Sequence, residues 1–214
     1  MKTQLMTALL SAALALSACS ENKPDTAAVY MLLDTSGTYT EELDKAQRIT
    51  NYLLATLDSG DSLAIARIDS GSFSEKDIIA KVTFDDKPSA MTSQKRAFKR
   101  NIDEFVASAK GSAHTDISGA VLQASEYLNE TGATHRYILI FSDLEEDLPK
   151  NHIRDFMIPL TDVHVVALNV TKLRQDNIDP REYIQRLDQW EQRVSDGGGT
   201  WKVVNDLEHL ERML

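Results

Sequence analysis

Residues 29–40, VYMLLDTSGTYT, join an apolar run to a cluster of oxygen-bearing side chains. The run from Val29 to Leu33 is short and apolar, which is typical of a strand buried on both faces. Asp34, Ser36 and Thr38 follow it directly. Such residues often do no more than form a turn. Whether these three do more depends on what the rest of the chain places beside them.

Apolar runs and helical periods alternate along the rest of the chain, which indicates an α/β domain with a mostly parallel sheet. The predicted strands are residues 27–33, 62–68, 78–84, 135–141, 163–170 and 200–204. The predicted helices are a helix capped by Thr40, residues 93–110, residues 116–129, a helix from Pro180 up to the glycines at 197–199, and residues 207–214. The short polar connection 69–77 favours an antiparallel hairpin at one edge of the sheet. We therefore expect a single domain over residues 27–214.

Composition places the chain among soluble globular proteins and excludes some partners. Hydrophobic residues make up 42% of the 214 residues and charged residues 26%, both ordinary shares. The formal net charge is −10. Nucleic acids and anionic membrane faces attract basic surfaces, so we expect no nucleic-acid binding.

The N-terminus reads as a targeting segment that does not belong to the fold. Lys2 gives a charged start, and the apolar stretch Leu5–Leu16 is too short to span a bilayer comfortably. The sequence LSAC, Leu16–Cys19, resembles the lipobox of bacterial lipoprotein precursors. That resemblance implies a signal peptide at residues 1–18, lipidation of Cys19 and a tether at residues 19–26. The alternative is an ordinary secretory signal with an incidental cysteine.

The residues around Cys19 also bear on location. Cys19 is the only cysteine, so a disulfide within the chain is impossible. Ser20, not aspartate, follows it, and in a host with two membranes this resemblance implies the outer membrane, facing the periplasm, rather than the inner membrane. The tether is polar and contains a proline, and about seven extended residues reach roughly 23–25 Å. We therefore expect the domain to lie close to its lipid anchor.

Oxygen-bearing side chains gather at the predicted carboxyl edge of the sheet, where ligands bind in open parallel α/β sheets. Asp34, Ser36 and Thr38 follow the first strand, Asp143 follows the fourth, and Thr115 ends the loop before a helix on the same edge. These two carboxylates and three hydroxyls suit a hard cation. We expect Mg²⁺, with Mn²⁺ or Ca²⁺ as alternatives.

This arrangement resembles the metal-ion-dependent adhesion site of von Willebrand factor type A (VWA) domains. Asp34-Thr35-Ser36-Gly37-Thr38 matches the first motif of that family, Thr115 the second element and Asp143 the third. The tail GGGTWKVVNDLEHLERML resembles the family's glycine turn, last strand and closing helix. The resemblance covers residues 27–214. It implies a Rossmann-like α/β fold, with a central, mostly parallel six-stranded sheet, one antiparallel edge strand and helices on both faces.

The resemblance further implies a binding module rather than an enzyme. The hydroxyls and carboxylates would coordinate Mg²⁺ and leave one position open for an acidic residue of a partner protein. The chain departs from the family's pattern in two places, and these departures bear on the partner more than on the metal. Thr38 stands where serine is commoner and keeps the hydroxyl. Leu144 stands where many relatives have glycine, and the acids at 145–147 could repel an acidic ligand, or could add ligands and favour Ca²⁺.

Two other functions are weighed against this one. A metal-dependent phosphatase of the haloacid-dehalogenase type also places aspartate after its first strand, but it needs a second acid where this chain has Ser36. No G-x-S-x-G elbow surrounds Ser36, and only His114 is a candidate base. A structural subunit with a vestigial metal site is the third possibility. Asp116, which could add a sixth ligand, is expected to be the N-cap of its helix instead.

Overall fold

The computed structural model describes residues 25–37, 42–150, 153–173, 175–205 and 210. Its strands are β1 (Ala27–Asp34), β2 (Ser62–Ile68), β3 (Ile78–Thr83), β4 (His135–Phe141), β5 (Val163–Leu168) and β6 (Thr200–Val204). Its helices are α2 (Leu43–Thr56), α3 (Pro88–Ser108), α4 (Ile117–Thr131) and α5 (Pro180–Asp196), with short 3₁₀ turns η3 (Glu75–Asp77) and η4 (Gln175–Asn177).

The six strands form one sheet in the order β3-β2-β1-β4-β5-β6. Every neighbouring pair is parallel except β2 and β3, which are antiparallel. Strand β1 lies at the centre, and its side chains from Ala28 to Asp34 are all buried. The predicted fold is therefore confirmed, including the antiparallel edge strand and its polar connection.

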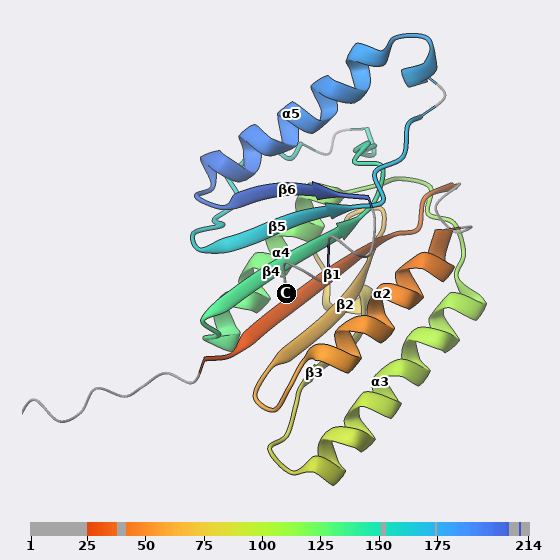
Figure 1. Ribbon diagram of the computed structural model, residues 1–214. Coiled ribbons are helices and arrows are strands. Elements are labelled where there is room, and N and C mark those ends of the chain that lie inside the picture. The colour runs from red at the N-terminus through yellow and green to blue at the C-terminus, as the bar shows by residue number, and fades with distance from the viewer. Residues whose placement is uncertain (1–24, 38–41, 151–152, 174, 206–209, 211–214) are drawn as a thin grey trace, which may run out of the picture.

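Helices cover both faces of this sheet, as Figure 1 shows. Val29, Met31 and Leu33 of β1 face the core beneath α2 and α3. Tyr30 and Leu32 face the opposite core, beneath α4 and α5. Because side chains alternate along a strand, the continuous apolar run of β1 serves two cores at once.

The predicted boundaries hold where local signals are strong. Strands β2, β4 and β6 have the predicted bounds. Helix α3 begins at Pro88, five residues earlier than expected, and the proline occupies the first turn, where its missing N–H costs nothing. Strand β5 ends two residues early, because Asn169 adopts a left-handed conformation with φ of 54°. The expected cap Thr40 lies outside the described residues, and of the expected closing helix only Leu210 lies within them.

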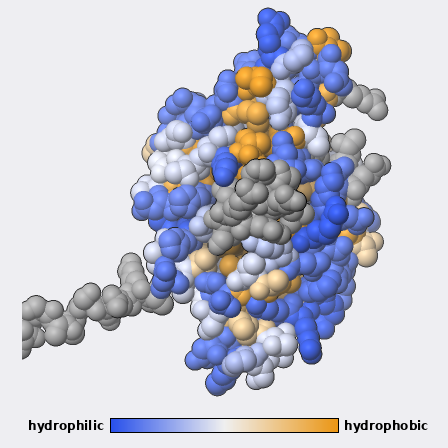
Figure 2. Space-filling model, viewed as in Figure 1, coloured by the Kyte–Doolittle hydropathy of each residue, from blue (hydrophilic) through white to orange (hydrophobic). Residues whose placement is uncertain are grey.

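Surface polarity differs across the molecule. Figure 2 shows a mostly hydrophilic face, with apolar side chains exposed in the region of α5. Ile178, just before this helix, is 89% exposed, and Ile184 within it is 53% exposed. None of the helices in the described part of the chain is both long enough and apolar enough to cross a membrane.

Candidate functional site

Asp34 ends the central strand β1 with a fully buried carboxylate. The backbone N–H of Ser36 donates to its Oδ1 at 2.7 Å. The hydroxyl of Ser142, which follows the adjacent strand β4, donates to its Oδ2 at 2.6 Å. The parallel pairing of β1 with β4 brings these strand ends together, although Ser142 is 108 residues away in the sequence. The Asp34 carboxylate is thus fixed by groups from two strand ends.

Asp143, one residue after Ser142, is a second buried carboxylate at this edge and is only 6% exposed. Burial is the main cause that raises the pKa of Asp143 to about 6, and the nearby negative charges of Asp34 and Glu145 raise it further. The N–H of Glu145 donates to Oδ1 of Asp143 at 2.9 Å, and this bond and the Arg186 charge lower the pKa in part. The Asp143 carboxyl therefore holds its proton more readily than an ordinary aspartate.

The loops that carry the predicted hydroxyls contact one another. The N–H of Ser112 donates to the Thr35 carbonyl at 2.8 Å, in a short parallel bridge that pairs Ser112 with Ser36. Thr115, which is 4% exposed, exchanges two backbone hydrogen bonds of 2.8 and 3.0 Å with Asp147. The structure therefore brings together the segments that carry four of the five predicted ligands. The fifth, Thr38, lies outside the described residues.

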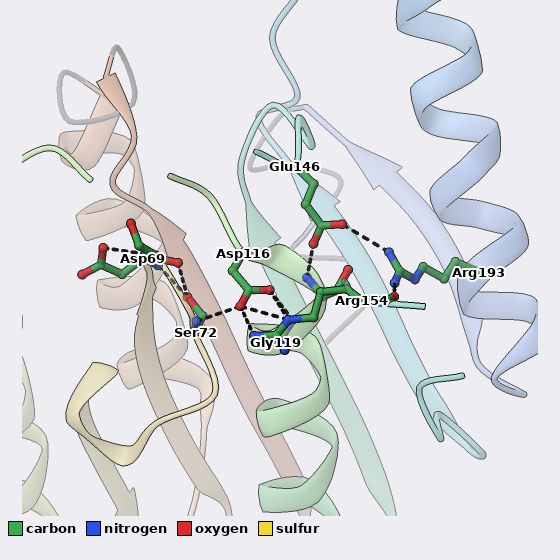
Figure 3. Close-up of polar contacts among 9 residues, drawn as sticks. Asp69, Ser72, Asp116, Gly119, Glu146, Arg154 and Arg193 are labelled. Carbon is green, nitrogen blue, oxygen red and sulfur yellow. Dashed lines mark hydrogen bonds and ion pairs between the residues drawn. The ribbon is translucent and has the colours of Figure 1, made fainter. Parts of the chain in front are cut away.

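Asp116 has a different role from these predicted ligands. Its Oδ1 accepts the Gly119 N–H at 2.9 Å, which confirms it as the N-cap of α4. Its Oδ2 accepts the Ser72 N–H at 3.0 Å, and Arg154 donates to both oxygens (Figure 3). Burial alone would raise the pKa of Asp116, but the bonds from Arg154 and Gly119 outweigh burial and lower it. The oxygens of Asp116 are used by the protein itself.

Glu146 extends this network from the segment after β4 to two helices (Figure 3). Its Oε1 accepts the Ser118 N–H of α4 at 2.7 Å, and its Oε2 lies 3.4 Å from Nη1 of Arg193 in α5. Arg193 also donates to the carbonyl of Arg154 at 2.5 Å. Asp147, the next acid, places Oδ2 3.0 Å from Nδ1 of His114. Glu146 and Asp147 therefore make protein contacts beside the predicted metal edge.

Arg186 of α5 is a residue that sequence reasoning missed. Its Nε donates to the main-chain carbonyl of Asp143 at 2.9 Å, and its other nitrogens bind the buried Asp176 at 3.3 and 2.7 Å. Helix α5 thereby supports the loop that carries Asp143. No local sequence motif predicts this contact, because Arg186 and Asp143 are 43 residues apart. The same holds for Arg154 and Asp116.

The donor chemistry fits a hard cation. Neither Asp34 nor Asp143 forms a salt bridge with any residue that the structure describes. Over the same residues, no group of three or more His, Cys, Asp or Glu side chains could hold a metal ion. A cation at this edge would therefore rest on two carboxylates supplemented by hydroxyls and water, a ligand set that Mg²⁺ accepts.

Comparisons with known proteins fix the fold class. No protein-family model matches the sequence, and no curated protein sequence does. A solved aerotolerance-related membrane protein from Bacteroides fragilis, carrying multiple mutations to serines, matches with a TM-score of 0.50 and 13% identity, over 88% of this chain and 95% of that chain. A von Willebrand factor type A structure from Catenulispora acidiphila matches with a TM-score of 0.51 and 14% identity, over 88% of this chain and 41% of that chain. This chain has the VWA fold.

The VWA fold agrees with the order of strands described above and with the position of the candidate site. Asp34 at the end of β1 and Asp143 after β4 lie at the carboxyl edge of the sheet, where the sequence places the three elements of the adhesion motif. At such low identities, the similarity to these structures establishes the fold of this chain but not its function.

Proposed function

We propose that this VWA domain binds a partner protein through a divalent ion, Mg²⁺ first, held at the edge of Asp34 and Asp143. The observation that carries the proposal is this pair of buried carboxylates at adjacent strand ends. Two buried negative charges at neighbouring strand ends are costly, and a bound cation would offset both their burial and their mutual repulsion. Asp34, Ser36, Thr38, Thr115 and Asp143 would hold the ion.

The ion would supply an open coordination position to an acidic side chain of the partner. The chain's own groups prepare the site for that ion. Ser142 orients the Asp34 carboxylate, and the Glu145 N–H orients that of Asp143. The backbone bridge to Asp147 holds Thr115 beside the loop after β4. Because these contacts exist before the partner arrives, little ordering is left to be done on binding.

The proposed location is the bacterial cell envelope, with the chain anchored by lipid at Cys19. Strand β1 begins at Ala27, close to the tether, and ends at Asp34, the candidate ligand. A strand of this kind advances about 3.3 Å per residue, so the metal edge lies roughly 20–25 Å from the tethered edge. The metal edge would then face away from the lipid surface and meet a partner in the periplasm.

No contact in the described residues favours an enzyme. A serine hydrolase would need a base within hydrogen-bond reach of Ser36, and among the described contacts none joins Ser36 to His114, whose Nδ1 lies 3.0 Å from Oδ2 of Asp147. A phosphatase of the haloacid-dehalogenase type would need an acid where Ser36 stands. We therefore keep the binding module as the proposed function, with a vestigial metal site as the outcome that the next experiment can reveal.

The test is a pull-down from solubilised cell envelope with the mature chain as bait, in Mg²⁺ and in EDTA. Asp34→Asn is the loss-of-site variant, and Asp188→Asn, an exposed acid on α5, is the matched control. A protein retained by the wild type and by the control only with Mg²⁺, and lost from Asp34→Asn, supports the proposal and identifies the partner. Equal retention in every lane, or none, contradicts it.

A further inference from the structure

Leu144, which directly follows the candidate ligand Asp143, has a backbone conformation that leucine rarely adopts. Its φ is 67°, in the left-handed region, where the Cβ atom crowds the following carbonyl oxygen. Its side chain is nonetheless buried in the core beneath α4 and α5. A residue keeps such a conformation only where the surrounding structure holds it, and residues held in this way cluster at functional sites. The contacts that hold Leu144 are therefore candidates for a role at the metal edge.

Two side chains of α5 bind the backbone on either side of Leu144. Nε of Arg186 donates to the carbonyl of Asp143 at 2.9 Å, and Nε1 of Trp190 donates to the carbonyl of Leu144 at 3.1 Å. Arg186 and Trp190 stand four residues apart, so they lie on the same face of the helix. Both side chains are largely buried, which shields these hydrogen bonds from water. We call this pair of donors the α5 clamp.

Trp190 is connected to the Asp143 carboxylate through a single peptide group. The Leu144 carbonyl and the Glu145 N–H belong to the same peptide group, which is planar and rigid. Trp190 binds that carbonyl, and the N–H donates to Oδ1 of Asp143 at 2.9 Å. The side chain of Trp190 therefore fixes the direction of the N–H that holds this carboxylate.

Arg186 is connected to the Asp34 carboxylate in a similar way. It binds the Asp143 carbonyl, and the N–H of the same peptide group, that of Leu144, donates to the Ser142 hydroxyl at 3.0 Å. The Ser142 hydroxyl in turn donates to Oδ2 of Asp34 at 2.6 Å. Each donor of the α5 clamp thus reaches a different candidate carboxylate through one peptide group, and the left-handed conformation of Leu144 sets the angle between the two groups.

We propose that Arg186 and Trp190 are positioning residues for the Mg²⁺ site, and that a bound ion and the α5 clamp stabilise each other. This inference rests on the proposed function, because it needs an ion at Asp34 and Asp143. An ion binds most tightly where its ligands are already oriented, so losing either donor should weaken ion binding. Coupling between two sites is reciprocal, so the ion should in turn strengthen the hydrogen bonds of the clamp. A clamp with a structural role only would affect stability and leave ion affinity unchanged.

The first test is a Mg²⁺ titration of the ¹⁵N-labelled mature chain, with the dissociation constant read from the Glu145 amide resonance. Trp190→Phe keeps a buried aromatic ring but removes the N–H, and we expect about fivefold weaker binding, the usual effect of one hydrogen bond. Arg186→Lys keeps the charge beside Asp176 but loses the fork that also reaches the carbonyl, and should weaken binding similarly. The matched control is Arg193→Lys, because Arg193 donates to a carbonyl outside the path to the candidate ligands. Unchanged affinity in the first two variants, or equal weakening in the control, would overturn the proposal.

Two substitutions of Leu144 separate positioning from stability. Leu144→Gly deletes a buried side chain but accepts a φ of 67° without strain, whereas Leu144→Ile keeps the volume but is β-branched and disfavours that conformation. We expect Leu144→Gly to be the less stable variant in urea and to keep its Mg²⁺ affinity within about threefold of the wild type. Leu144→Ile should be the more stable variant and should bind Mg²⁺ about fivefold more weakly. If affinity instead follows stability, so that Leu144→Gly binds more weakly than Leu144→Ile, the proposal fails.

The wild type alone can show the reciprocal effect, because the chain has two tryptophans, Trp190 and Trp201. Saturating Mg²⁺ should shift the indole N–H resonance of Trp190 and slow its exchange with deuterium about fivefold. Trp201, on β6, should not respond. Equal responses, or none from Trp190 in a chain that binds Mg²⁺, would contradict the proposal. A wild type that binds no Mg²⁺ would contradict the proposed function as well, whereas Mg²⁺ binding that the variants leave unaffected would contradict this inference alone.

Discussion

Two pairs of buried carboxylates in this molecule differ in their partners. Asp116 and Asp176 are each bound by an arginine, Arg154 and Arg186 respectively. Asp34, at the end of β1, and Asp143, just after the neighbouring strand β4, have no such salt bridge within the described residues. The pKa of Asp116 and that of Asp176 are lowered, chiefly through the arginine hydrogen bonds that oppose burial, whereas the pKa of Asp143 is raised.

This difference separates structural acids from candidate ligands. A fold that needs a buried carboxylate for its own architecture supplies the compensating charge itself, as Arg154 does for Asp116. A pair left without such a charge is the one that we propose to hold an external cation. Both pairs lie near the same edge of the sheet, so the presence of arginine, rather than burial or position, distinguishes them.

The largest expected effect is on the compensated pair. Arg154→Ala leaves the Asp116 carboxylate buried without its counter-charge, and we expect a loss of about 3 kcal/mol in the free energy of unfolding. Urea denaturation would measure it. The control is Arg181→Ala, because Arg181 is 89% exposed and solvent screens its salt bridge with Asp179, so its loss should change stability little. Equal losses of stability in the two variants would show that burial does not make the salt bridge between Asp116 and Arg154 more stabilising than an exposed one.

Mg²⁺ should stabilise the fold through Asp34 and Asp143, by slightly less than the loss expected for Arg154→Ala. A ligand at 100 times its dissociation constant stabilises the folded state by about 2.7 kcal/mol. We expect Mg²⁺ to raise the melting temperature of the wild type and of Arg181→Ala alike. Asp34→Asn should lose this response while remaining folded, which circular dichroism can check. A response retained in Asp34→Asn would place the ion elsewhere.

Neutralising one uncompensated acid should stabilise the metal-free chain. In EDTA at pH 7, Asp143→Asn removes both the repulsion of Asp34 and the burial of a charge, and we expect a gain of about 2 kcal/mol. The same change at the compensated site, Asp116→Asn, should instead destabilise, because it breaks the salt bridge with Arg154. Urea denaturation measures both changes in stability. Their opposite signs test the difference between the two sites most directly. A loss of stability in both variants would contradict it.

The change in folding stability with pH should be the smallest of these effects. The folded-state pKa of Asp143, about 6, lies above that of an unfolded aspartate, about 3.9, so this group destabilises the fold increasingly as pH rises above about 4, and fully above about pH 6. In EDTA, its contribution should improve by about 1 kcal/mol as pH falls from 7 to 5. The difference between wild type and Asp143→Asn isolates it from other titrating groups.

Asp116 and Asp176 should show the opposite sign in a lower window. Their pKa values are lowered in the folded state, so their stabilisation is complete above the unfolded value of about 3.9 and is lost as pH falls through their folded values. A difference between wild type and Asp143→Asn that appears only below pH 4 would mean that Asp143 behaves like the compensated acids.

The sequence by itself determined the fold and the edge of the sheet at which the candidate ligands lie. Apolar runs and helical periods are local signals, and they placed β2, β4 and β6 at their observed bounds and Asp116 at the start of α4. The alternation of strands and helices implied a parallel sheet, whose carboxyl ends meet at one edge. Residues that follow different strands could therefore be assigned to one neighbourhood without knowledge of their contacts.

Only the tertiary structure decided which acids are compensated. Arg154 and Asp116 are 38 residues apart, and Ser142 and Asp34 are 108 apart. No periodic pattern connects such residues, because their meeting depends on the path of the segment after β4 and on side-chain packing. Secondary structure follows from neighbours in sequence, whereas charge compensation follows from neighbours in space.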